Sequence, residues 1–287
     1  MKKILVTGAN GQLGKSLRGL ASQYAGFEFL FADRETLDIA DQDAVNRYFA
    51  EHQPDACINC AAYTAVDKAE SDEDNAFAQN FLAVLYLSEA CLQHNSQLLH
   101  ISTDYVFDGA NNRPYRETDE TGPRTVYGSS KLKGEAAALD LNPKSIVVRT
   151  SWVYAKEGVN FVNKIKQLMQ DKPALTVVVD QTGTPTYAPD LAAALLSILT
   201  KVFEAPGTDF GGVYHYSNQG VTSWFDFAVA IRDISGASCN ISPVTSEQYP
   251  APAPRPAYSV LNKEKIRTTF GLEIPYWRDS LEECLKS

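Results

Sequence analysis

Short apolar runs alternate with helical segments through the first half of the chain, and this alternation is what most limits its fold. A long helix is predicted from about Asp72 to His94, because apolar residues recur there at helical spacing. Strands are predicted at residues 3–8, 27–33, 55–62, 97–102 and 145–151. Strands separated by helices pair in parallel through right-handed crossovers. The pattern therefore predicts the α/β class, with a doubly wound parallel sheet.

The second half of the chain has smaller elements that interleave. A helix is predicted to begin near Pro189, with Asp190 at its positively polarised end. The run GVYHYSN, residues 212–218, predicts another strand, and the next segment predicts a helix capped by Thr222. Open α/β sheets bind ligands beyond the carboxyl ends of their strands. We therefore expect a smaller C-terminal lobe over that edge.

Three glycines mark the first turn of the predicted sheet. The sequence TGANGQLG puts Gly8, Gly11 and Gly14 between the first strand and the first helix. Such glycines permit a tight turn, close approach of the backbone to a pyrophosphate, and close packing of the helix on the sheet. Asp33 follows about 20 residues later, at the end of the second strand, where a carboxylate can bind the adenosine ribose. The segment predicts a dinucleotide site.

The residue after Asp33 leaves the choice of dinucleotide open. Asp33 repels a 2′-phosphate, whereas Arg34 attracts one. NADPH and NADH are both expected cofactors, and the alternative for Arg34 is a solvated surface side chain.

The segment VYGSSKLKGE places Tyr127 one helical turn before Lys131. A tyrosine has an ordinary pKa near 10, and a nearby cation lowers that pKa and makes the phenol a better acid. Ser102, Thr103 and Asp104 follow the fourth strand, level with the expected nicotinamide, where a hydroxyl can hold a substrate oxygen. The alternative is that these hydroxyls satisfy loop backbone groups. Together with the glycine turn, the set predicts a carbonyl reductase.

The chain is acidic, with 26 Lys and Arg against 35 Asp and Glu and a net charge of −9. This balance argues against a surface for nucleic acid and against attraction to anionic membranes. Two lysines precede the first apolar run, but the run is too short for a signal peptide, and no segment has the length of a membrane span. Five scattered cysteines are typical of a reducing compartment. We expect a cytoplasmic protein.

Six segments of the chain have distinctive sequences: AAYTAVDKAE (61–70), STDYVFDG (102–109), VYGSSKLKGE (126–135), RTSWVYA (149–155), DQTGTPTYAPDLA (180–192) and RPAYSVLN (255–262). In this order, and nearly end to end, they resemble the extended short-chain dehydrogenase/reductase superfamily and, within it, the dTDP-4-dehydrorhamnose reductase family. The first two segments discriminate best, since nucleotide-sugar epimerases usually differ after the fourth strand. The resemblance implies a Rossmann fold.

The resemblance also implies a reaction. It implies NADPH- or NADH-dependent reduction of the 4-keto group of dTDP-4-dehydro-β-L-rhamnose to dTDP-L-rhamnose, the last step of dTDP-rhamnose biosynthesis. Tyr127 would be the proton donor, Lys131 would bind the ribose and tune the tyrosine, and Thr103 would orient the keto oxygen.

Ligand contacts follow from the same resemblance. Asp104 and Trp152 would touch the sugar, and Arg255, in a proline-rich loop, would bind the diphosphate or remain a solvated loop arginine. Beside Gly8, Gly14 and Arg34, the residues implied to line the dinucleotide are Asn10, Gly11, Gln12, Asp33, Asp38, Ile39, Ala62, Tyr63, Thr64, Tyr127 and Lys131.

The chain is predicted to fold into two structural parts. The NAD(P)-binding Rossmann domain comprises residues 1–151 and roughly 184–217. The substrate-binding lobe comprises roughly 152–183 and 218–287.

No metal site is predicted. Cys57 and Cys60 have the spacing of a redox or zinc pair, but they lie in a predicted strand without a second pair, which favours two core thiols. The four histidines show no ligand spacing. Some bacterial members of the family carry a glutamate after the third glycine that takes part in a magnesium-linked dimer. This chain has Lys15, and a cation does not ligate Mg²⁺. A homodimer stays open, but a magnesium-dependent one is not expected.

The sequence leaves open two alternatives to this reaction, a related enzyme activity and a noncatalytic role. The same catalytic residues serve nucleotide-sugar 4-epimerases and reductases of other 4-keto sugars. The family also has a eukaryotic relative that regulates a methionine adenosyltransferase, so a noncatalytic regulatory subunit is a third interpretation. The presence of Thr103, Tyr127 and Lys131 together favours catalysis.

Overall fold

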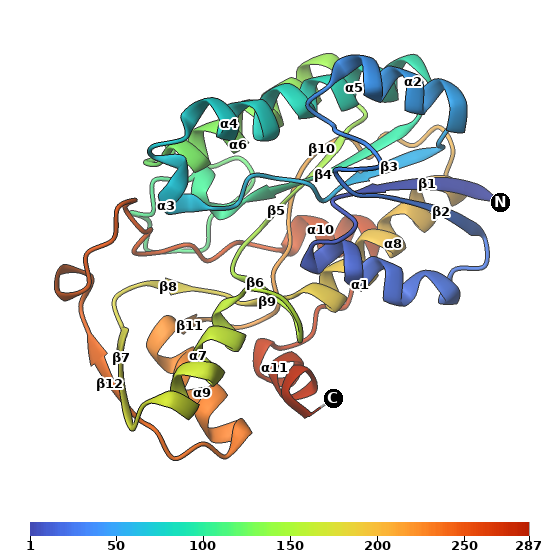
Figure 1. Ribbon diagram of the computed structural model, residues 1–287. Coiled ribbons are helices and arrows are strands. Elements are labelled where there is room, and N and C mark those ends of the chain that lie inside the picture. Colours follow the sequence, from blue (N-terminus) through green and yellow to red (C-terminus); the bar gives the residue numbers. More distant parts are fainter. Residues whose placement is uncertain (287) are drawn as a thin grey trace.

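The computed structural model describes residues 1–286 and has a six-stranded sheet at its centre (Figure 1). The strands are β1 (Lys2–Thr7), β2 (Phe27–Ala32), β3 (Ala56–Asn59), β4 (Gln97–Thr103), β5 (Ile146–Thr150) and β10 (Gly212–His215). Their order is β10-β5-β4-β3-β1-β2, and all neighbours are parallel. Every predicted strand is observed, so the predicted doubly wound parallel sheet is confirmed.

Helices cover both faces of this sheet (Figure 1). One face carries α2 (Gln42–His52), α5 (Ala83–Gln93) and α6 (Val126–Leu141). The other face carries α1 (Gln12–Leu20), α8 (Ala188–Glu204) and α10 (Glu264–Phe270). Because both faces are covered, the strands are apolar on both sides, and all four residues of β3 are buried.

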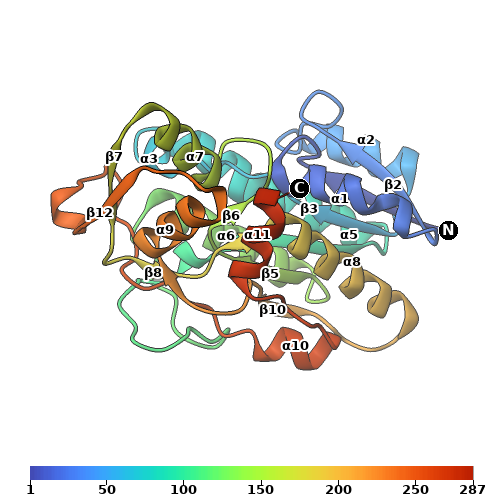
Figure 2. The same cartoon turned by 90° about the horizontal axis from the view of Figure 1, so that it is seen from below.

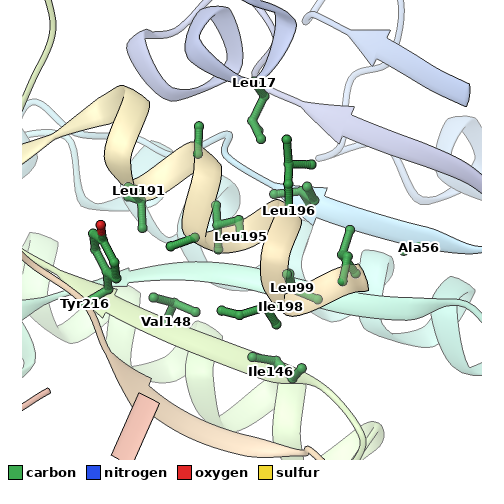
Figure 3. Packing of buried hydrophobic residues seen from close by; sticks show 14 of the residues in the cluster. Leu17, Ala56, Leu99, Ile146, Val148, Leu191, Leu195, Leu196, Ile198 and Tyr216 are labelled. Carbon is green, nitrogen blue, oxygen red and sulfur yellow. The ribbon is translucent and has the colours of Figure 1, made fainter. Parts of the chain in front are cut away.

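Helix α8 is the central contact below the sheet. It begins where the sequence predicts, with a proline in its first turn. Leu191, Leu195 and Ile198 recur at helical spacing and are fully buried. Figure 3 shows them facing Val148 and Ile146 of β5. Helix α8 thereby closes one of the two large apolar cores.

The long helix predicted at residues 72–94 is interrupted. It consists of α4 (Glu73–Phe77), a π-helical turn (Ala78–Leu82) and α5. Inside the π-helical turn, the fully buried Asn80 accepts a hydrogen bond from the backbone N–H of Tyr63 at 2.9 Å and donates to its carbonyl at 3.0 Å. An extra residue in a helix is frequent at functional sites. Here the π-helical turn directs the side-chain amide of Asn80 toward the loop after β3. Apolar periodicity in the sequence does not reveal such a turn.

The second half of the chain builds a C-terminal lobe beside the sheet (Figure 2). Its helices are α7 (Phe161–Asp171), α9 (Trp224–Ser235) and α11 (Trp277–Lys286). Its strands form three pairs: β7 (Ala174–Val178) with β12 (Asn240–Val244), β8 (Thr182–Gly183) with β11 (Thr222–Ser223), and β6 (Val153–Tyr154) with β9 (Thr186–Tyr187). The lobe has its own apolar core around Tyr154, Phe227 and Leu281.

Two details of the second half differ from simple expectation. Helix α9 is capped by Ser223, whose hydroxyl accepts from the N–H of Asp226 at 3.0 Å, and the predicted cap Thr222 lies in β11 instead. Ser and Thr cap helices comparably well, so adjacent candidates are not separated by sequence. Helix α10 leaves the lobe, because its Ile266 and Phe270 pack in the core below the sheet.

The remaining short elements connect these layers. They are α3 (Val66–Ala69) and the 3₁₀ turns Ala21–Gln23, Asp104–Val106 and Ser246–Gln248. Among the helices within residues 1–286, none combines the length and the apolar character that a bilayer crossing requires.

Leu195→Ala should lower the free energy of unfolding by about 2–5 kcal/mol, because it leaves a cavity between α8 and the sheet. Urea unfolding measures this difference. The matched control is Leu92→Ala on α5, where the side chain is 54% exposed and the change should stay within about 0.5 kcal/mol. Equal losses in the two variants would contradict the assigned core.

Candidate active site

A cavity of about 780 Å³ lies at the carboxyl edge of the sheet. The chain runs from β1 to β2 on one side and then returns to β3 on the other side of β1. Such a reversal separates the connecting loops and leaves a crevice where open α/β sheets bind ligands. The cavity is lined by the segments after β1, β3, β4 and β5, by α6 and by the start of α9.

The glycine turn closes tightly at one end of this cavity. Gly8 has φ +63°, and a Cβ on it would lie 2.7 Å from the backbone nitrogen of Ala61. A Cβ on Gly14 would lie 2.5 Å from the Gly8 carbonyl oxygen and 2.6 Å from the Ala9 Cα. Helix α1 begins at this point, and Gly11 at its N-cap provides no side chain for its first N–H groups. These free donors and the helix dipole suit a pyrophosphate.

Asp33 and Arg34 lie at the end of the cavity next to β2. The Asp33 carboxylate accepts hydrogen bonds from the backbone and hydroxyl of Thr36, at 2.9 and 2.8 Å, and from Asn10 Nδ2 at 2.9 Å. These bonds hold the pKa of Asp33 below its ordinary value, the bond from the Thr36 N–H most of all. Arg34 is 79% exposed, and its Nε lies 3.9 Å from Oδ2 of Asp38. It therefore remains accessible to a ligand.

Thr103 and Asp104 follow β4 directly and are both buried. The Thr103 hydroxyl donates to Asp104 Oδ1 at 3.0 Å and accepts from the backbone N–H of Tyr105 at 3.2 Å. Burial raises the pKa of Asp104 to about 6, against the opposing effect of the hydroxyls of Ser259 and Thr103. Its Oδ2 is buried without a hydrogen-bond partner among the described residues.

Tyr127 lies near the start of α6, where Thr125 caps the helix by accepting from the N–H of Gly128 at 2.9 Å. Its ring packs edge-on against Tyr105, with 5.5 Å between the centroids. Burial raises the pKa of Tyr127 to about 12, the Thr103 hydroxyl offsets part of that rise, and the Asp104 carboxylate adds to it. The sequence-based expectation of a lowered pKa is thus reversed by burial.

Burial is the main cause of this reversal, and the amine of Lys131 is bound away from the phenol. Nζ lies 2.6 Å from the Ile101 carbonyl oxygen and 3.2 Å from His100 Nε2. Burial lowers the pKa of Lys131 to about 8, although Glu135 and Cys60 act in the opposite direction. The pair is therefore in place, but the lysine charge is not directed at the phenol.

Glu135 fixes α6 on the sheet. Its carboxylate accepts from Arg149 Nη2 at 2.7 Å and from Arg149 Nε at 2.9 Å, and both side chains are 4% exposed. The Ser102 hydroxyl donates to the same carboxylate. Ser102 is therefore occupied by the scaffold, and Thr103 carries the more available hydroxyl of the two.

Two stacked indoles form the opposite wall. Trp152 follows β5 with φ +49°, a left-handed conformation that is rare and costly for an aromatic residue. Its ring stacks on Trp224, with centroids 3.5 Å apart and planes 10° apart. Gly183 lies against it, where a Cβ would come within 2.6 Å of the indole. The strained backbone thus turns a flat apolar surface toward the cavity.

Most residues singled out from the sequence come together in this cavity. Three do not line it: Asn10 is held by Asp33, Gly14 packs against the turn, and Arg255 pairs with Asp67 at 2.6 Å. Those that line it are Gly8, Gly11, Gln12, Asp33, Arg34, Asp38, Ile39, Ala62, Tyr63, Thr64, Thr103, Asp104, Tyr127, Lys131 and Trp152.

Comparison with known proteins agrees with this arrangement. The family model described as the RmlD substrate binding domain matches residues 1–287. A dTDP-4-dehydrorhamnose reductase of Aggregatibacter actinomycetemcomitans is 41% identical over 98% of this chain and 98% of its own. The chain belongs to the dTDP-4-dehydrorhamnose reductase family.

Two other known proteins are similar to this chain over nearly their full length. The spore coat polysaccharide biosynthesis protein SpsK of Bacillus subtilis is 43% identical over 100% of this chain and 98% of its own. The structure of a dTDP-4-dehydrorhamnose reductase from Bacillus anthracis in complex with NADP is 36% identical, covers 100% of this chain and 99% of that one, and superposes with a TM-score of 0.93. The family resemblance found in the sequence is confirmed.

Several cavity residues of this reductase family member were not predicted. Trp224 lies in the C-terminal lobe, and no pattern in the sequence ties it to the strand ends. Tyr105 follows Asp104 directly, so its proximity to the strand end was a usable signal. Cys60 lines the cavity and is half-buried, whereas Cys57 is fully buried, so only Cys57 fits the interpretation of core thiols completely.

Arg149→Met should lower the free energy of unfolding by about 3–5 kcal/mol, because the Glu135 carboxylate would stay buried without its cation. Methionine keeps most of the apolar volume, so the loss reports the charge. Thermal and urea unfolding measure it. In the control Arg113→Met the ion pair with Asp119 involves a 54% exposed arginine, and the loss should stay below about 1 kcal/mol. A loss as small in Arg149→Met would contradict the buried pair.

Proposed function

We propose that this protein reduces the 4-keto group of dTDP-4-dehydro-β-L-rhamnose to a hydroxyl, giving dTDP-L-rhamnose, with NADPH or NADH as the hydride donor. The observation that carries the proposal is the convergence of Thr103, Tyr127 and Lys131 on one cavity with the glycine turn. Full-length relatives at about 40% identity that are named as reductases of this kind support it.

The residues present fit a dinucleotide. The glycine turn leaves no room for a Cβ at Gly8 or Gly14, and the N–H groups that open α1 receive no side-chain cap. Asp33 and Arg34 lie at the far end of the same cavity. We propose that the turn holds the pyrophosphate and that Asp33 binds the adenosine ribose, which would put the nicotinamide near the end of β4.

The chemical roles proposed for the side chains follow from their positions. A bound reduced nicotinamide supplies a hydride to the carbonyl carbon. The Thr103 hydroxyl holds the keto oxygen, and Tyr127 gives that oxygen its phenolic proton. The cationic form of Lys131 stabilises the phenolate that remains and binds the ribose. Asp104 and the Trp152 indole hold the sugar, because both line the cavity, one with a carboxylate and the other with a flat apolar face.

The proposed role of Arg255 needs a rearrangement. Its guanidinium is bound to the Asp67 carboxylate, which also accepts from the N–H of Ala253 at 3.2 Å. A substrate diphosphate would have to take Arg255 from Asp67, so this contact is proposed for the substrate-bound protein only.

We also propose the division into a Rossmann domain of residues 1–151 and roughly 184–217 and a lobe of roughly 152–183 and 218–287, except that α10 within the last range packs against the sheet. A cytoplasmic location suits a nucleotide-sugar substrate. Lys15 lies 3.8 Å from Glu157 within the same chain, and a lysine does not ligate Mg²⁺. We therefore propose that a homodimer of this chain would not depend on magnesium.

The reaction is tested by following oxidation of NADPH and of NADH with dTDP-4-dehydro-L-rhamnose made in situ by the upstream dehydratase and epimerase. Formation of dTDP-L-rhamnose supports the proposal. Binding of both dinucleotides without turnover would overturn it, and would direct attention to other 4-keto sugars or to a regulatory subunit.

Tyr127→Phe should lower kcat by roughly 10²–10⁴-fold, because it removes the general acid and keeps the buried ring. The Kd for NADPH, measured by fluorescence, should change little. Tyr249→Phe is the matched control, since that ring is 59% exposed, and its kcat should equal that of the unchanged protein. Retained turnover in Tyr127→Phe would refute the role of the phenol.

Arg34→Ala should raise KM for NADPH roughly tenfold or more and leave KM for NADH nearly unchanged, because a charge-assisted hydrogen bond to the 2′-phosphate contributes about 1.5–3 kcal/mol. Steady-state kinetics with each dinucleotide measure this. Arg47→Ala on α2, an exposed arginine away from the cavity, is the control for a general loss of positive charge. Equal effects on both dinucleotides would show that Arg34 does not contact the 2′-phosphate.

A further inference from the structure

The orientation of one buried amide, that of Asn59, is fixed by the backbone. Asn59 ends β3 and is fully buried. Its Oδ1 accepts from the Thr7 hydroxyl at 2.7 Å and from the backbone N–H of Ala61 at 3.2 Å. A backbone N–H is always a donor, so the amide atom that faces it must be the oxygen. The Nδ2 group therefore points the other way, toward β4.

This orientation sets the tautomer of His100. Asn59 Nδ2 lies 3.1 Å from His100 Nδ1, and an amide nitrogen only donates, so Nδ1 must be the acceptor. A neutral imidazole then carries its proton on Nε2. The ring is fully buried, and burial is the main cause that lowers the pKa of His100 well below its ordinary value. The ring is neutral, with Nε2–H directed at α6.

The Nε2–H group of His100 faces the amine of Lys131. Its Nζ lies 3.2 Å from His100 Nε2 and 2.6 Å from the Ile101 carbonyl oxygen. An ammonium has three donors and no acceptor, so it would oppose Nε2–H donor to donor. A neutral amine has a lone pair that accepts from Nε2–H, while one of its own hydrogens is donated to Ile101. The geometry around Nζ matches the neutral amine.

The other groups that face Lys131 do not reverse this preference. Glu135, one turn further along α6, favours the ammonium, but its carboxylate is already bound by Arg149 and by Ser102. Cys60, after β3, acts more weakly in the same direction. Burial opposes both and has the largest effect, so the pKa of Lys131 is lowered.

We propose that His100 is a positioning residue that acts through Lys131: its Nε2–H stabilises the neutral amine of Lys131 relative to the ammonium, and Lys131 is protonated more readily when ligand binding draws it from this bond. The proposal rests on the function proposed above, which needs the cationic form of Lys131 beside Tyr127. The proton comes from solvent, so dinucleotide binding should take up a proton from the buffer.

The tautomer is measured directly by ¹⁵N NMR of the full-length protein with labelled histidine. The chain has four histidines, and the His100→Gln variant assigns the signal of interest. The expected result is a protonated Nε2 and an unprotonated Nδ1 that stay unchanged between about pH 6 and pH 9. A proton on Nδ1, or a charged ring at pH 7, would overturn the proposal even where the variant fails to fold.

The coupling to Lys131 is tested with His100→Gln. A glutamine amide can turn its oxygen toward Nζ and accept from an ammonium, so the pKa of Lys131 in the free enzyme should rise. Activity that needs the cation falls as pH rises through this pKa, and the profile of kcat/KM reports the free enzyme. The alkaline limb should therefore move to higher pH, by about one unit.

Proton uptake gives a second readout that needs no turnover. Calorimetry of NADPH binding at pH 8, in two buffers of different ionisation enthalpy, should show uptake in the unchanged protein and at least twofold less in His100→Gln. His52→Gln, at the end of α2, is the matched control and should change neither the uptake nor the alkaline limb. Equal uptake in the unchanged protein and His100→Gln would show that the histidine does not control Lys131.

These results separate the two proposals. Absent sugar turnover, with the expected tautomer and proton uptake, refutes the proposed reaction and leaves the control of Lys131 in place. Normal turnover with a proton on Nδ1 refutes the role of His100 alone.

Discussion

One buried ion pair fixes helix α6 over the sheet, and the geometry of the site depends on it. Glu135 receives three hydrogen bonds from Arg149 of β5 and one from Ser102 of β4, so the helix is tied to two adjacent strands. Displacement of α6 would separate two buried charges without exposing them to water. The free-energy cost of this is far larger than that of losing an apolar contact. Tyr127 and Lys131 therefore keep their places relative to the end of β4 without any contact from a ligand.

The topology of the sheet also explains how an acidic protein can bind an anionic ligand. A protein with a net charge of −9 repels an anionic ligand at long range, so its phosphate site must be local. Parallel strands bring the starts of the following helices to one edge, and the reversal beside β1 opens a space there. Backbone N–H groups at the start of α1 then supply the favourable field without a cluster of basic side chains.

The sequence predicts those parts of this arrangement that depend on local pattern. Apolar runs buried on both faces reveal the strands, and residues next to strand ends, such as Thr103, reach the cavity by topology alone. The sequence does not predict contacts made across the fold. The π-helical turn depends on Asn80 meeting the loop at Tyr63, Trp224 reaches the cavity from the other lobe, and Arg255 is held by Asp67. Each depends on residues far apart in the chain, for which periodicity carries no signal.

The direction of the Tyr127 pKa shows why spacing alone misleads about chemistry. A lysine one turn from a tyrosine would lower the pKa of the phenol only if its charge were present and pointed at the ring. In this structure burial favours the neutral form of both groups, and the amine is directed at the Ile101 carbonyl oxygen and at His100. Burial thus lowers the share of each charged form, because desolvating a charge is costly, although a pKa of about 8 leaves Lys131 mostly charged at neutral pH. The proposed activation of the phenol therefore depends on where a bound ligand leaves the Lys131 charge, which spacing along the helix does not reveal.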